Sequence, residues 1–209
     1  MMLGANTLAE AEAEAETLIN RGLAADGSWL ATAPDAASGQ AVLIRSTDAA
    51  DSVRTGDFTR LRTSNVPRLK INDIDNASGL GIDFISNQGG VRFYLTGLAA
   101  VPEIATDTYL PGDVADHLSS LAGMTEPGAS SGGQMAATAW LRAGATGSYG
   151  SYGKVEEPCN VADKFPRAMV LVGRYAEGNT LIEADWKSVR TPGQGLFVGE
   201  PLARPWGHR

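Results

Sequence analysis

The chain has 209 residues, of which 43% are hydrophobic and 20% are charged, a composition that excludes an intrinsically disordered protein. Its formal net charge is −7, which argues against nucleic acid as a partner because an acidic chain repels phosphate backbones. No apolar run approaches the roughly 18 residues that span a bilayer, so no transmembrane segment is expected.

Cysteine and histidine are scarce. One cysteine, Cys159, leaves no intramolecular disulfide, and together with two histidines it is too little for a closed zinc site. A metal site made of carboxylates stays possible, but the composition gives it no support, so no metal is expected. No P-loop or dinucleotide-binding motif occurs either, so we expect no cofactor. The length predicts a single domain over 1–209, and the opening residues lack the cationic and apolar pattern of a signal peptide.

Helices and strands alternate along most of the chain. The strongest strand is 91–96, where β-branched and aromatic residues stand between glycines. In chain order the sequence predicts a helix over 9–23, a strand over 41–46, a short helix over 49–54, strands over 69–74 and 91–96, a helix over 134–143, a strand over 145–149, helices over 165–177 and 181–189, and a strand over 196–198. This alternation predicts a three-layer α/β/α sandwich with a mostly parallel central sheet.

Three stretches of the chain carry a resemblance to a bacterial family. Residues 111–123, 141–166 and 175–205 resemble the C-terminal part of an uncharacterised family found in species with exosortase-type protein sorting. The resemblance implies a periplasmic or extracellular location. It also implies that the chain lacks an N-terminal portion that its relatives have.

The order of short motifs resembles a second, more distant group. After strand 91–96 comes Gly97-Leu98-Ala99, and the later motifs are the turn 119–123, Gly144-Ala145, the helix start 180–184 and Gly199-Glu200-Pro201. This order is similar to that of the clan CD cysteine peptidases, which include gingipains and caspases. The resemblance implies a caspase- or gingipain-like fold with Leu98 at the position of the base histidine and Ser120 at that of the nucleophilic cysteine. Leucine accepts no proton, and a serine without a base is a weak nucleophile.

The segment 116–120 brings several reactive side chain types together. Asp116, His117, Ser119 and Ser120 lie within five residues, so His117 is a candidate base and either serine a candidate nucleophile. In an extended strand, however, Asp116 and His117 point to opposite faces, and catalytic triads are usually assembled from distant segments. The alternative is that Asp116 and His117 satisfy backbone groups at the end of a strand.

Cys159 is the remaining candidate nucleophile. A reactive cysteine needs nearby positive charge, whereas Glu156 and Glu157 precede it, which favours an inert thiol. The loop 156–160 follows a strand, and open α/β sheets bind ligands at such strand ends. Glu156, Glu157 and Asn160 are therefore candidate binding residues, together with Asp116 at the end of another segment.

Three functions remain open at this point. The first is a catalytically silent peptidase-like domain that binds a protein partner or a second copy of itself. The second is a hydrolase that uses His117 with Ser119, Ser120 or Cys159. The third is a structural subunit of a larger assembly. The substitutions at the two expected catalytic positions favour the first function over an enzyme, and the distance from the His117 ring to the hydroxyls is the observation that discriminates between them.

Overall fold

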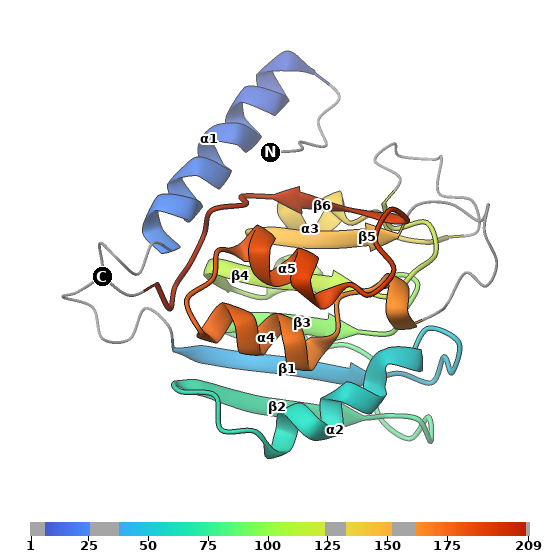
Figure 1. Cartoon of the computed structure of the whole chain (residues 1–209). Coiled ribbons are helices and arrows are strands. Elements are labelled where there is room, and N and C mark those ends of the chain that lie inside the picture. The colour runs from blue at the N-terminus through green and yellow to red at the C-terminus, as the bar shows by residue number, and fades with distance from the viewer. Residues whose placement is uncertain (1–6, 26–37, 124–132, 152–161, 208–209) are drawn as a thin grey trace.

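The structure, a computed structural model, describes residues 7–25, 38–123, 133–151 and 162–207. In these ranges six strands form one sheet in the order β2-β1-β3-β4-β5-β6 (Figure 1). The strands are β1 (Gly39–Arg45), β2 (Leu69–Asp75), β3 (Val91–Thr96), β4 (Tyr109–His117), β5 (Gly147–Ser151) and β6 (Gly195–Gly199). Strands β1 to β5 pair in parallel and β6 runs antiparallel to β5. The prediction of a mostly parallel central sheet is confirmed.

Helices cover both faces of this sheet, which makes three layers. Helices α2, α4 and α5 lie on one face and α3 lies on the other, while α1 extends beyond the sheet (Figure 1). The helices are α1 (Leu8–Ala25), α2 (Gly56–Thr63), α3 (Thr138–Arg142), α4 (Ala168–Ala176) and α5 (Leu181–Ser188), with 3-10 turns η1 (Val53–Thr55), η2 (Ile104–Thr106) and η3 (Ala162–Lys164). Within the described ranges, no helix combines the length and the apolar character needed to cross a lipid bilayer.

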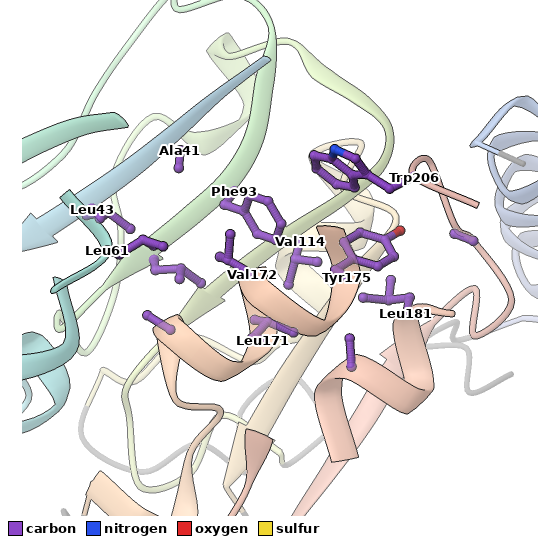
Figure 2. Close-up of a cluster of buried hydrophobic side chains, with 14 of the residues drawn as sticks. Ala41, Leu43, Leu61, Phe93, Val114, Leu171, Val172, Tyr175, Leu181 and Trp206 are labelled. Atoms are coloured by element: carbon purple, nitrogen blue, oxygen red, sulfur yellow. The ribbon is translucent and has the colours of Figure 1, made fainter. Parts of the chain in front are cut away.

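Strand β3 is central and every residue in it is buried, as expected for a parallel strand covered on both faces. From Phe93 onward its side chains alternate between two cores. Phe93 contributes to the core under α4, where its ring lies 6.1 Å from those of Tyr175 and Trp206 (Figure 2). Tyr94 contributes to the core under α3, with its ring 4.9 Å from Trp140.

Helix α1 is attached to the body of the domain by one polar and one apolar anchor. Arg21 forms an ion pair of 3.0 Å with the buried Asp113 of β4 and also donates to Thr146 and to two backbone carbonyls. Leu18 packs in a small core with Ala137, Leu141 and Val198. The sequence prediction of a helix over 9–23 agrees with α1 to within two residues at each end.

Other sequence predictions differ from the structure. The short helix expected over 49–54 is a turn followed by η1, and the polar helix α2 comes after it. The helix expected over 134–143 begins only at Thr138, because the backbone of 135 and 137 bonds to the carbonyls of Ala99 and Ala122. The strands expected over 41–46 and 145–149 lie one to two residues away from β1 and β5.

Candidate functional site

The carboxyl ends of the parallel strands meet at one edge of the sheet, which we call the carboxyl edge. Strand β3 ends there at Thr96 and β4 ends at His117, and these two residues are partners in the ladder. Ligands of open α/β sheets bind outside this edge, so the turns that follow β3 and β4 are the place to look for chemistry.

The turn after β3 is pinned against the loop that follows β1. The Ser46 hydroxyl donates to the carbonyl of Gly97. A Cβ on Gly97 would lie 2.2 Å from the carbonyl oxygen of Asp51, so only glycine fits this close approach. Leu98, at the position that the resemblance assigns to a base, is half-buried and packs against the core under α3. This turn therefore presents an apolar side chain, which accepts no proton.

His117 is fully buried, and both of its ring nitrogens already have partners. Nε2 lies 2.8 Å from the carbonyl oxygen of Met135, and Nδ1 accepts a hydrogen bond of 3.0 Å from Trp140 Nε1. Since a carbonyl only accepts and an indole only donates, the ring is the neutral tautomer with its proton on Nε2. Burial lowers the pKa of His117 from 6.5 to about 4, which keeps the imidazole neutral.

Ser119 and Ser120 lie in the turn after β4, and both hydroxyls bond to one amide side chain. Ser119 donates to Oε1 of Gln134 at 2.6 Å, and the Ser120 hydroxyl lies 3.1 Å from Nε2 of the same residue. Gln134 Oε1 also accepts from the backbone of Leu121 at 2.8 Å. In the described part of the chain His117 contacts neither hydroxyl through a hydrogen bond. The structure thus brings the two serines together and separates both from the imidazole.

Asp116 points to the opposite face of β4 from His117, as the strand geometry predicts. Its carboxylate forms a buried ion pair of 2.6 Å with Nη1 of Arg54. Nη2 of Arg54 donates to the carbonyls of Thr96 and Asp116 at 3.0 and 3.1 Å. Burial raises the pKa of Asp116, and Arg54 offsets part of that rise. Because Asp116 is fully buried, its carboxylate is closed to direct contact with a ligand.

Two further buried groups lie near enough to Asp116 to feel its charge. Burial raises the pKa of Asp185 in α5 well above its ordinary value, and Asp116 adds to the rise. Burial, and then the charges of Asp185 and Asp116, raise the pKa of Tyr149. Among the described residues, one oxygen each of Asp116, Asp185 and Tyr149 has no hydrogen-bond partner. We call Arg54, Asp116, Tyr149 and Asp185 the polar cluster.

Four of the candidate residues lie outside the described ranges. Cys159, Glu156, Glu157 and Asn160 belong to 152–161, of which nothing is described. Among the residues that are described, no group of three or more His, Cys, Asp or Glu side chains is arranged to hold a metal ion.

Sequence reasoning missed the two residues that hold this edge together, Gln134 and Arg54. Gln134 was predicted only as the start of a helix, and its serine partners are 14 and 15 residues away. Arg54 was predicted at the end of a short helix, and its partner Asp116 is 62 residues away. Such long-range polar contacts leave no local pattern in a single sequence.

Comparison of the chain with protein-family models, with curated proteins and with solved structures gave no match. The chemistry open to the carboxyl edge therefore follows from its geometry alone.

Proposed function

We propose that this chain is a catalytically silent domain of peptidase-like architecture that binds a protein partner or a second copy of itself. The observation that carries the proposal is the state of His117, a buried, neutral imidazole with both nitrogens bonded to Met135 and Trp140. A serine nucleophile needs a base within about 2.6–3.2 Å. Ser119 and Ser120 instead bond to the amide of Gln134, which takes up no proton.

A binding role is supported by the surface of α1. Leu8, Ile19 and Leu23 are 76%, 48% and 64% exposed. Ile19 and Leu23 are one turn apart on the same side of the helix, so they form an exposed apolar pair that a partner can cover, while Glu12 and Glu16 separate this pair from Leu8. A location outside the cytoplasm is part of the proposal and depends on the family resemblance of 111–123, 141–166 and 175–205.

The test uses the purified full chain and two reactive probes. A fluorophosphonate reports an activated serine, and iodoacetamide reports a reactive cysteine. We expect no selective labelling of Ser119, Ser120 or Cys159 and no hydrolysis of a peptide library. The variants Ser120→Ala and Cys159→Ser serve as matched controls, because each removes one candidate nucleophile at little cost in volume.

Peptide hydrolysis that disappears in Ser120→Ala would show that the turn after β4 is catalytic and would overturn the proposal. Hydrolysis that disappears only in Cys159→Ser would favour the hydrolase hypothesis with Cys159 as the nucleophile.

A further inference from the structure

A pocket of about 350 Å³ lies beside the carboxyl edge on the face covered by α2 and α4. Its walls come from η1 and the start of α2, from η3 and the residue before α4, and from the segment after α5. The charged residues that line it are Arg54, Arg60, Arg167, Arg190, Asp57 and Asp163. We call it the arginine pocket, and its excess of positive charge contrasts with the net charge of −7 on the whole chain.

The protein engages only a few of the guanidinium donors in this pocket. Asp57 is shared by Arg60 at 3.9 Å and Arg167 at 3.4 Å, and Asp163 lies 3.4 Å from Arg190. Charge-assisted hydrogen bonds are typically about 2.7–2.9 Å, so all three contacts are long. Each guanidinium has five N–H donors, and the single carboxylate beside each of Arg60, Arg167 and Arg190 leaves most of those donors available to a ligand.

A second pocket, of about 370 Å³, shows the opposite arrangement. It is lined by Arg45, Arg62, Asp73 and Asp75. Arg45 pairs with Asp75 at 3.5 Å and Arg62 pairs with Asp73 at 3.3 Å. Each arginine there has its own carboxylate, so the second pocket has no surplus of cationic donors.

The buried wall of the arginine pocket is formed by Arg54. Arg54 is 4% exposed, and although its two terminal nitrogens bond to Asp116 and Thr96, its Nε has no acceptor among the described residues. A buried N–H without an acceptor is costly. This Nε is closed to solvent, so the donors that a ligand can reach belong to the three more exposed arginines, Arg60, Arg167 and Arg190.

The position of the pocket in the fold supports the same conclusion. From β1 the chain passes to β2 on one side, whereas β3 is followed by β4 on the other side, so the strand order reverses between β1 and β3. Open α/β sheets bind ligands at the carboxyl ends of the strands at such a reversal. Arg54 contacts the carbonyl of Thr96, the last residue of β3, and therefore joins the pocket to this point.

We propose that the arginine pocket binds a small ligand through an oxyanion, either a phosphate or a carboxylate group. The planar donors of arginine match both groups, which accept paired hydrogen bonds. The volume lies near the lower end of the about 300–1,000 Å³ typical of ligand pockets, which suits a small ligand. The proposal goes beyond the proposed function, because it needs neither the serines nor His117.

Isothermal titration calorimetry of the full chain tests the proposal, with inorganic phosphate and succinate as separate probes at constant ionic strength. We expect saturable binding of at least one probe. Arg190→Gln should weaken it about tenfold, since a charge-assisted hydrogen bond is lost. The matched control is Arg174→Gln, because Arg174 is also exposed and paired with a carboxylate, Glu177 at 3.0 Å, but lies outside the pocket. The affinity of Arg174→Gln for the probe should stay within about twofold of the parent's affinity.

Each outcome bears on the proposal. Binding of phosphate alone identifies a phosphate ligand, and binding of succinate alone identifies a carboxylate ligand. Absence of saturable binding for both probes overturns the proposal, as does an equal loss in Arg174→Gln and Arg190→Gln. Arg60→Gln is a further variant of the arginine pocket. It replaces Arg190→Gln in the test if circular dichroism shows that Arg190→Gln is unfolded. Selective fluorophosphonate labelling of a serine would contradict the proposed function, but it would leave the outcome of the calorimetric titration unchanged.

Discussion

Two neighbouring residues of β4 show two ways to bury a polar side chain. His117 faces α3 as a neutral ring whose donor and acceptor are both matched, by Met135 and Trp140. Asp116 faces the other side and depends on one cation, Arg54, while one of its oxygens has no partner among the described residues. A matched neutral group avoids the desolvation cost of a charge, whereas a buried ion pair is stable only while both partners are present. The two faces of β4 should therefore respond differently to substitution.

The largest effect is expected from Arg54→Leu. Removal of the guanidinium leaves Asp116 buried without its cation, which should lower the free energy of unfolding by about 3–5 kcal/mol. Urea unfolding followed by tryptophan fluorescence measures this loss, because Trp140 and Trp206 are both buried.

The matched control is the double variant Arg54→Leu with Asp116→Leu. Replacement of a whole buried ion pair by apolar residues is often close to neutral, so the double variant should recover most of the lost stability. A single variant as stable as the parent would mean that the pair contributes nothing.

His117→Leu should have an intermediate effect that depends on pH. At pH 7 it leaves the Trp140 donor and the Met135 carbonyl unmatched, at a cost of about 2–3 kcal/mol. The folded pKa of His117, about 4, is below the ordinary value of 6.5, so the unfolded chain binds the proton more tightly. The stability that neutral His117 contributes to the parent is therefore lost as the pH falls from 6.5 towards 4, by up to about 3 kcal/mol. Urea unfolding at several pH values should show the difference between parent and variant shrinking over this range.

Parent and variant must be compared with each other, because another buried group, Asp113, changes the free energy of unfolding with pH in the opposite direction. Burial raises the pKa of Asp113 from 3.8 to about 6. The folded state therefore binds the Asp113 proton more tightly than the unfolded state does, and stability is lost as the pH rises from 3.8 to about 6. This contribution is common to both proteins and cancels. If the free energy of unfolding changed equally with pH in parent and variant between pH 4 and 6.5, this would contradict a neutral, buried His117.

The smallest effect is expected from Asp185→Asn. Burial raises the pKa of Asp185 well above 3.8, so the folded state favours the protonated carboxyl and loses stability as the pH rises above 3.8. An asparagine removes that loss. At pH 7 the variant should match the parent or exceed its stability by up to about 1 kcal/mol in urea unfolding. Asp116→Asn is the comparison, since it leaves Arg54 buried without a counter-charge and should be clearly destabilised.

The parts of the fold that the sequence predicts are those with a local signal. The strand over 91–96 matches β3, because a fully buried β-branched and aromatic run between glycines has few alternatives. Helix α2 was missed because its residues are polar, with only Phe58 and Leu61 buried. The antiparallel direction of β6 also has no local signal, since direction depends on how the preceding helices return the chain to the sheet.

The candidate site was predicted only in part, and for a related reason. The sequence predicts that Asp116 and His117 face opposite sides if their segment is extended, and the structure has them so, although β4 itself was not among the predicted strands. It could not supply their partners, because Arg54 and Trp140 lie 62 and 23 residues away. The arginine pocket is built from three separated segments, so it could not have been found before the chain was folded.

The anchoring of α1 has a consequence for folding during synthesis. A ribosome releases the chain from its N-terminal end, so α1 emerges before the segments it packs against. The acceptors of Arg21 come much later, with Asp113 92 residues and Thr146 125 residues downstream. The apolar partners of Leu18 extend to Val198. Helix α1 therefore completes its docking only after β6 has been translated.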